Sequence, residues 1–247
     1  MKNRLSRCAA VIAVFLAGRV SAADEDGFAK ANQAYNEARF QEAAEGYEAL
    51  VQSEHWHANL FYDLGNAYYR LGNFGKAVLN YERALALDPR QPEADANLRL
   101  ARDEARALEL RKDWIERYAS MATVKQYSIA AAVGLWLAVF VTAHLVLSHR
   151  RSAGRIALIV IGVLVCGASA FAILTLENGT RGNALAVVTA KETEARLATA
   201  DNAKSILLLP AGSEIKILSE RGDWIYAALP NDQRGWIPSS SAERVRL

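Results

Sequence analysis

Hydrophobic residues follow three different patterns along this chain. Between residues 24 and 108, apolar and polar positions form a pattern that recurs after 34 residues. Two uninterrupted apolar runs come next, at 127–147 and 156–176, and neither contains Asp, Glu, Lys or Arg. From residue 185 onward, short β-prone runs alternate with turn signals. We therefore predict a multidomain chain with an all-α part, a two-helix apolar hairpin and a small all-β part.

Each apolar run reaches the ~20 residues that a helix needs to cross the hydrocarbon core of a bilayer. The connecting segment, 148–155, carries three arginines and a histidine. Such a short, arginine-dense loop stays on the cytoplasmic side of a membrane. The pattern thus predicts transmembrane helices at 127–147 and 156–176, joined by a cytoplasmic loop, with both flanking domains on the opposite side.

Two further segments border these helices. Residues 109–126 include Trp114 and Tyr118, whose side chains suit the headgroup region of a membrane. They predict a juxtamembrane helix, which either lies along the interface or forms a rigid stalk. Residues 177–184 predict a linker that leads out of the membrane into the all-β part, 185–247.

The first residues have the three parts of a bacterial export signal. Lys2, Arg4 and Arg7 form a basic start, an apolar stretch follows, and small residues precede Asp24. Residues 1–23 are therefore predicted to be a signal peptide, and the alternative is an uncleaved anchor. Both alternatives place the next domain outside the cytoplasm, which predicts an inner-membrane protein with two spans and periplasmic N- and C-terminal domains.

An internal repeat occupies residues 24–108. With an offset of 34, four pairs align: Phe40 with Phe74, Ala43 with Ala77, Tyr47 with Tyr81, and Glu48 with Glu82. The second copy has small and aromatic residues at set positions, namely Gly65, Tyr68, Gly72, Phe74, Ala77, Tyr81, Ala84 and Pro89. This pattern resembles the tetratricopeptide repeat (TPR) family, whose units are 34-residue helix pairs. The resemblance implies about two and a half repeats, with a last helix that caps the stack.

The TPR resemblance also implies a binding surface. In TPR arrays the first helix of each repeat lines a groove that receives an extended or helical peptide. The residues implied to face it are Asn32, Tyr35, Asn59, Tyr62, Asn66, Tyr69 and Arg70. Asn32 and Asn66 occupy equivalent repeat positions, at which asparagine in TPR proteins often binds the ligand backbone. The alternative is that several of the tyrosines pack between helices instead.

The all-β part contains two glycine–tryptophan segments. These are Gly222-Asp-Trp224-Ile-Tyr226 and Gly235-Trp236-Ile237, and they follow a Pro-Ala-Gly turn. Their order is similar to that of bacterial SH3-like domains, which implies a small closed barrel. Trp224, Tyr226 and Trp236 are candidates for a face that binds peptide or cell wall, and the alternative is that they belong to the core.

Composition excludes several classes of function. A formal net charge of +2 gives no electrostatic case for a nucleic-acid partner. Cys8 and Cys166 lie in the leader and in an apolar run, so no disulfide framework is expected. His55 and His57 fall short of the three or four ligands that zinc requires, and neither a metal nor a cofactor is predicted. Because the familiar catalytic motifs are missing from the sequence, we do not expect an enzyme.

The order of signal peptide, short TPR array, transmembrane hairpin and SH3-like domain resembles the TPR–SH3 membrane proteins of the bacterial aerotolerance (Bat) operon. The resemblance implies a non-catalytic scaffold or adaptor whose periplasmic TPR domain binds other envelope proteins and assembles an aerotolerance or stress-related complex. The implied partners are membrane-anchored von Willebrand factor A domain proteins and a MoxR-type ATPase. An alternative function is a cell-wall module that binds peptidoglycan through the SH3-like domain.

Overall fold

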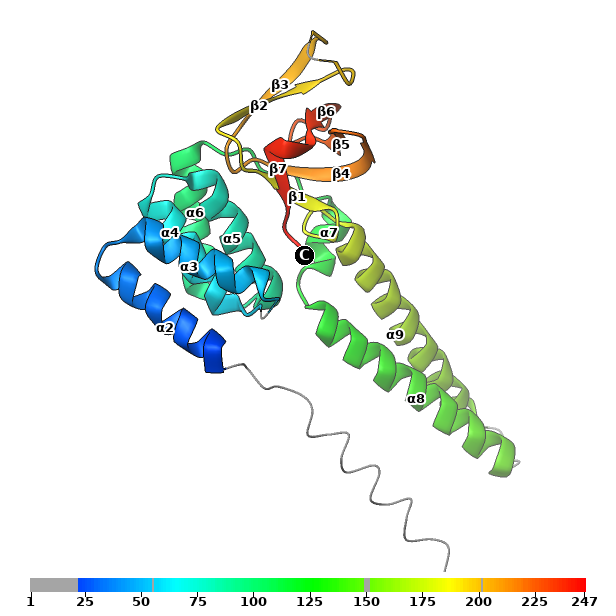
Figure 1. Cartoon of the computed structure of the whole chain (residues 1–247). Helices are drawn as coiled ribbons and strands as arrows, with labels where there is room; N and C mark the ends of the chain where they lie inside the picture. Colours follow the sequence, from blue (N-terminus) through cyan, green and yellow to red (C-terminus); the bar gives the residue numbers. More distant parts are fainter. Residues whose placement is uncertain (1–21, 55, 149–151, 201) are drawn as a thin grey trace, which may run out of the picture.

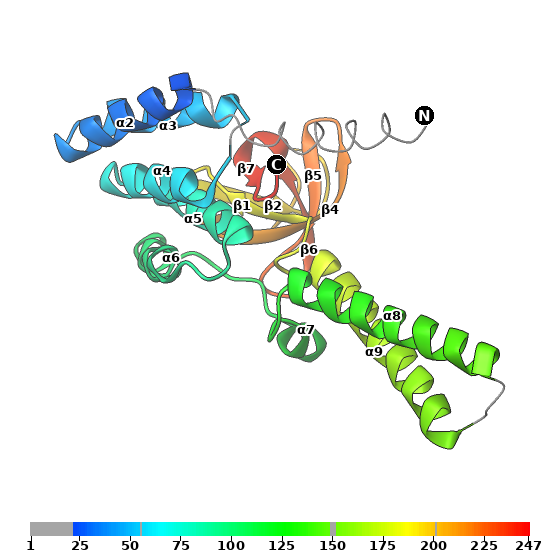
Figure 2. The ribbon, with the colours of Figure 1, turned by 90° about the horizontal axis from the view of Figure 1, so that it is seen from below.

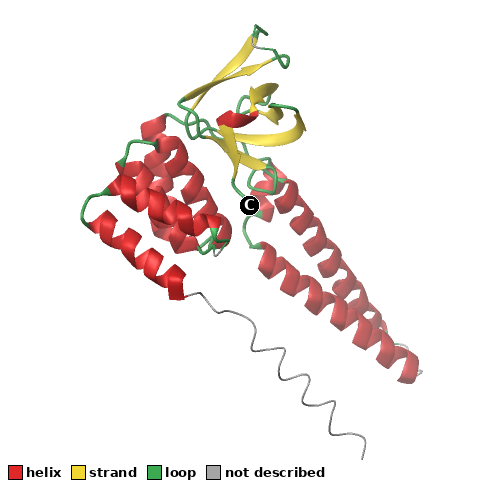
Figure 3. Cartoon of the chain, viewed as in Figure 1, coloured by secondary structure: helices red, strands yellow, loops and turns green. Residues whose placement is uncertain are grey.

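The computed structural model describes residues 22–54, 56–148, 152–200 and 202–247 (Figure 1). Of the predicted signal peptide, only Ala22 and Ala23 fall within these residues, and positions 149–151 of the predicted loop lie outside them. The helices are α2 (Ala22–Asn36), α3 (Phe40–Gln52), α4 (Ala58–Arg70), α5 (Phe74–Leu87), α6 (Pro92–Ala105), α7 (Trp114–Ala119), α8 (Val124–Ser148), α9 (Ala153–Asn178) and the 3-10 helix η1 (Ser239–Ser241). The strands are β1 (Leu185–Val188), β2 (Glu192–Arg196), β3 (Ser205–Pro210), β4 (Glu214–Arg221), β5 (Trp224–Ala228), β6 (Arg234–Pro238) and β7 (Ala242–Arg244). Figure 3 shows the strands gathered in one part of the molecule, with the long helices outside it.

Helices α2 to α6 form the helical repeats. Helix α2 packs on α3, α4 packs on α5, and α6 follows as a single helix against α5. Local polar groups begin two of these helices: Nδ1 of His57 accepts a hydrogen bond from the Leu60 amide at 3.0 Å, and Oδ1 of Asn73 accepts one from the Lys76 amide at 3.2 Å. Gly72, with φ +72°, adopts the left-handed conformation between α4 and α5 that favours glycine.

Two tyrosines at equivalent positions fill the repeats. Tyr47 on α3 and Tyr81 on α5 are each 1% exposed. The ring of Tyr81 lies against Gly65, where an added Cβ would be only 2.7 Å from the ring atom Cε1. The glycine therefore lets α4 and α5 approach closely around a large side chain.

Helices α8 and α9 form a hairpin that points away from the rest of the chain (Figure 1). With 25 and 26 residues, both are long and apolar enough to cross a membrane. Only 11% and 17% of their most apolar windows are buried, which is unlike the core helices of a globular domain. Large side chains such as Phe140 and Leu164 are exposed instead. The hairpin therefore presents a large exposed apolar surface.

The two hairpin helices touch through glycine. A Cβ added to Gly162 would lie 2.6 Å from the carbonyl oxygen of Gly134, and a Cβ on Gly134 would lie 2.7 Å from that of Gly162. Within a bilayer, such small residues allow backbones to approach and increase the van der Waals contact between helices.

We expect Gly162→Ala to push α8 and α9 apart by about 1 Å or more, because the new methyl group would meet rigid backbone atoms. Spin labels, one on each helix in a chain carrying Cys8→Ser and Cys166→Ser, would report the change by double electron–electron resonance. Gly167→Ala is the matched control on α9, since an added Cβ there meets nothing within 4 Å. Equal distances in the two variants would contradict glycine-mediated packing.

The strands form one antiparallel sheet in the order β3-β2-β6-β5-β4-β1-β7. Its outermost strands, β3 and β7, do not pair with each other in the described part of the chain, so the sheet is open and the predicted closed barrel is wrong. Strands β2 and β6 share a single register pair, Arg196 with Trp236. The β2–β3 hairpin consequently projects from the other strands (Figure 1), which keeps the two edges apart.

Strand β1 is buried on both faces. Leu185 and Val187 belong to the core of the helical repeats, whereas Ala186 and Val188 belong to the core of the sheet. Successive side chains of a strand point to opposite faces, so β1 joins two cores. Helix α5 lies beside this strand (Figure 2). The repeats and the sheet therefore pack as one unit.

A buried cluster of charges crosses the same interface. Arg102 on α6 contacts Glu82 on α5, with Nη2 2.5 Å from Oε1, and also contacts Glu214 on β4. These three side chains are 4–6% exposed. Burial raises the pKa of the Glu214 carboxyl, and the positive charge of Arg102 opposes that rise.

The predicted juxtamembrane helix, 109–126, is not one continuous helix. Helix α7 covers only Trp114–Ala119, and α8 begins at Val124. The preceding backbone bonds to the sheet instead: the Glu214 amide donates to the Leu108 carbonyl at 2.8 Å, and the Leu110 amide donates to Oε2 of Glu214 at 3.0 Å. Tertiary hydrogen bonds have thus replaced those of a helix.

Candidate functional site

The seven residues implied to bind protein lie on two helices. Asn32 and Tyr35 belong to α2, and the other five belong to α4. Spacings of three, four and seven residues place those five on one side of α4. We call the surface formed by these side chains and their neighbours the first-helix face; its members are Asn32, Tyr35, Asn59, Tyr62, Asp63, Asn66, Tyr69, Arg70 and Asn97.

The two equivalent asparagines hold the two buried tyrosines. The Tyr47 hydroxyl donates to Oδ1 of Asn32 at 2.6 Å, and the Tyr81 hydroxyl donates to Oδ1 of Asn66 at 2.8 Å. Burial raises the pKa of both tyrosines, so both hydroxyls keep the proton that they donate. Each asparagine is thereby fixed by the same contact in its own repeat.

This contact leaves the other end of each amide available. The Nδ2 groups of Asn32 and Asn66 donate no hydrogen bond within the described residues, and both side chains are half-buried. An amide NH₂ group can donate two hydrogen bonds. The first-helix face therefore presents two oriented donors at equivalent repeat positions.

Asn97 on α6 extends the face, although it was not among the predicted site residues. Its Nδ2 donates to Oδ1 of Asn66 at 2.9 Å and to the Tyr62 hydroxyl at 3.3 Å. The 34-residue offset could have revealed it, because Asn97 is the repeat equivalent of Asp63 on α4. These bonds tie the capping helix to the side chains of α4.

The tyrosines of the face are partly packed and partly exposed. Tyr35 contacts Phe40 edge to face at 5.3 Å, and Tyr69 contacts Phe74 in the same way at 5.5 Å. The Arg70 guanidinium lies 4.4 Å from the centre of the Phe40 ring. Both tyrosine rings are half-buried and pack against a phenylalanine of their own repeat, and their contact with a partner stays a prediction. Asn59, which is exposed, accepts a hydrogen bond from Gln91 at 3.3 Å.

Asp63 is a second residue of the face that was not predicted as a site residue. It lies on α4 between Asn59 and Asn66, one turn from each. Burial raises the pKa of its carboxyl to about 6. Among the described residues no hydrogen bond or salt bridge reaches this carboxylate, although it lies close enough to Tyr47 to help raise the pKa of that hydroxyl. The Asp63 carboxylate of this face thus has no ion-pair partner among the described residues.

Removing this charge should stabilise the fold at neutral pH. The unfolded chain loses the Asp63 proton near pH 3.8 and the folded chain near pH 6, so folding is penalised above pH 6 and not below pH 3.8. We expect Asp63→Asn to raise the free energy of unfolding at pH 7.5 by about 1–2 kcal/mol, after allowance for solvent screening. Denaturant unfolding of the full chain in micelles at pH 7.5 and pH 3.5 would test this. An equal effect at both pH values would contradict it.

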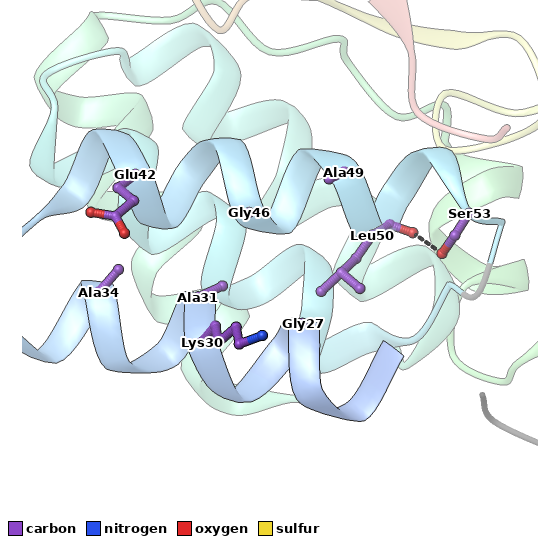
Figure 4. A pocket seen from close by; sticks show the side chains of 9 residues that line it. All are labelled: Gly27, Lys30, Ala31, Ala34, Glu42, Gly46, Ala49, Leu50 and Ser53. Carbon is purple, nitrogen blue, oxygen red and sulfur yellow. Dashed lines mark hydrogen bonds between the residues drawn. The ribbon is translucent and has the colours of Figure 1, made fainter. Parts of the chain in front are cut away.

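A separate apolar pocket lies between α2 and α3 (Figure 4). Its volume is about 310 Å³, and its wall consists mainly of small residues from the two helices. Figure 4 shows Gly27 and Ala31 opposite Gly46 and Leu50. None of the seven predicted residues lines it, so it is distinct from the first-helix face.

The three aromatic residues predicted for the sheet share one of its faces. Tyr226 on β5 and Trp236 on β6 are register partners, with ring centres 4.9 Å apart. Trp224 lies two residues before Tyr226 and is therefore on the same face. All three are half-buried, whereas the alternating Ile225 and Ala227 belong to the core.

The comparison with known families assigns one repeat. Residues 58–91 match the family model of the tetratricopeptide repeat, which spans α4, α5 and the turns that bound them. No curated protein matches the chain. TPR units mediate protein–protein interactions, so the repeats point to a protein partner. Within the described residues, no group of three or more His, Cys, Asp or Glu side chains could hold a metal ion.

Proposed function

We propose that this chain is a non-catalytic scaffold of the bacterial inner membrane, whose first-helix face binds an extended segment of another envelope protein. Its family match supports a protein partner, and the apolar α8–α9 hairpin supports membrane attachment. The arginine-rich segment 148–155 favours a cytoplasmic position for the hairpin loop. The repeats and the sheet then lie together in the periplasm.

The main support for this proposal comes from Asn32 and Asn66, which occupy equivalent repeat positions. Their Oδ1 atoms are engaged by Tyr47 and Tyr81, which directs the Nδ2 donors of Asn32 and Asn66 outward from those tyrosines. An extended peptide presents backbone carbonyl groups that need donors. Two such donors, each fixed in advance by a buried tyrosine, would bind backbone carbonyls at a reduced entropic cost.

The resemblance to the Bat operon proteins narrows the class of partner. It favours membrane-anchored von Willebrand factor A domain proteins and a MoxR-type ATPase as members of the same assembly, linked to aerotolerance or stress. The SH3-like resemblance rests on the glycine–tryptophan segments around Trp224 and Trp236.

Crosslinking mass spectrometry of the tagged full chain in its native membrane tests the proposal. The variant is Asn32→Asp/Asn66→Asp, because aspartate keeps the oxygen that accepts the tyrosine proton and loses the outward NH₂ group. The control is Gln52→Glu, which makes the same chemical change on the exposed end of α3. We expect crosslinks from the first-helix face to one or two membrane proteins in the wild type and the control, and their loss in the double variant. Crosslinks that persist in the double variant, or that never involve this face, would refute the proposal.

A second candidate function is binding of peptidoglycan by the sheet. The observation that favours it is the Tyr226–Trp236 pair, since aromatic platforms on a sheet face suit flat or sugar-like ligands. Co-sedimentation of the full chain in micelles with purified cell-wall sacculi would test it. Trp236→Ala should abolish the binding, whereas Trp56→Ala, in the turn after α3, should leave it unchanged.

A further inference from the structure

We propose that the first-helix face recognises a lysine or arginine side chain of its peptide partner, which pairs with the Asp63 carboxylate. This inference rests on the proposed function, because it names the chemistry of the segment that the same face would bind. Its basis is an imbalance of charge on helices α2, α4 and α6.

Every cationic side chain of these three helices already has a partner. Lys30 pairs with Asp26 at 2.6 Å, and Arg99 pairs with Asp95 one turn away on α6. Arg70 lies over the Phe40 ring. The fourth, Arg102, is buried between two glutamates at the sheet. Asp63 is left without a cation among the described residues, and acidic residues outnumber basic ones on these helices.

The surroundings of Asp63 suit a cationic side chain. It lies near the Tyr47 hydroxyl, which donates a hydrogen bond to Asn32 of the same face. The carboxylate is therefore partly withdrawn from water, and a cationic side chain placed there would pair with it more strongly than in bulk solvent. The two nearest asparagines on α4 lie one turn to either side of Asp63 and bring no positive charge. A cation from outside would therefore meet a partly buried carboxylate without displacing an existing ion pair.

An acidic or neutral peptide fits this surface less well. A carboxylate brought beside Asp63 would place two like charges at a partly desolvated position, which is unfavourable. A neutral side chain would leave the Asp63 charge uncompensated and further desolvated. Charge complementarity thus selects a basic segment over the alternatives.

Binding to three peptide pools tests the inference. Each pool contains acetylated, amidated dodecapeptides of otherwise random sequence without Lys, Arg, Asp or Glu, and a single central position is fixed as lysine, norleucine or glutamate. The full chain in micelles would be immobilised, and binding would be measured at low and at high salt. We expect the lysine pool to bind the wild type roughly 5–10-fold better than the norleucine pool at low salt, with a smaller ratio at high salt.

Two variants test whether the Asp63 carboxylate causes the preference for lysine. Asp63→Asn should remove the preference for lysine and bind the norleucine pool better than the wild type does, because no charge is then desolvated by the neutral side chain. Glu45→Gln on α3 removes the same charge from an exposed position outside the face, and it should keep the preference. Equal binding of all pools by the wild type, a preference for glutamate, or a lysine preference that survives in Asp63→Asn would overturn the inference and leave the proposed function standing. Failure of every pool to bind would overturn both.

Discussion

Replacing Arg102 with alanine is expected to lower the free energy of unfolding by about 3–5 kcal/mol. The change would remove the cation that Glu82 and Glu214 share, and among the described cations only Arg181, whose Nη2 lies 3.7 Å from Oε1 of Glu82, would remain near these buried carboxylates. The lower stability should appear as faster hydrogen–deuterium exchange in both α6 and β4, by roughly two to four powers of ten, in the full chain held in micelles. We expect α6 and β4 to lose protection from exchange together, because Arg102 joins the repeats to the sheet.

Arg99 provides the matched control on the same helix. It also pairs with a carboxylate, Asp95, but its side chain is 73% exposed. Arg99→Ala should therefore change stability by no more than about 0.5 kcal/mol. If the two variants behave alike, the buried cluster does not couple the repeats to the sheet.

Gly65→Ala is expected to destabilise the chain by about 2–3 kcal/mol, although alanine favours helix more than glycine does. The new Cβ would lie 2.7 Å and 2.8 Å from two atoms of the Tyr81 ring, which is 1% exposed and has little room to move. Any shift of that ring would also strain the hydrogen bond to Asn66 and so disturb the first-helix face. Thermal unfolding in micelles, followed by circular dichroism, would measure the loss.

Gly27→Ala makes the same change on α2. There the added Cβ meets only the end of the Leu50 side chain, at 3.2 Å, and a flexible side chain can yield. The helix preference of alanine should then leave stability unchanged or raise it by up to about 1 kcal/mol. An equal loss in both variants would show that the Tyr81 ring is not the cause.

Part of the candidate site could be predicted from the sequence. The helical positions of Asn32, Tyr35 and the α4 residues follow from the 34-residue offset, since equal spacing along equivalent helices gives equal orientation. The hydrogen-bond partners of these residues could not be predicted from that offset. That Asn66 contacts both Tyr81 and Asn97 depends on how three helices pack, and the unpaired state of Asp63 depends on where every cation of the face is engaged.

Local spacing in the sequence determined the helical repeats and the two long apolar helices, because helix formation and membrane insertion depend mainly on residues close together in the chain. Only the tertiary structure decided that the sheet stays open, that β1 is shared by two cores, and that Leu108 and Leu110 bond to the sheet instead of continuing a helix. The contact of Arg102 with Glu214 joins positions 112 residues apart. Periodicity carries no information about such distant pairs; they form because each buried polar or apolar group must find a partner when the chain becomes compact.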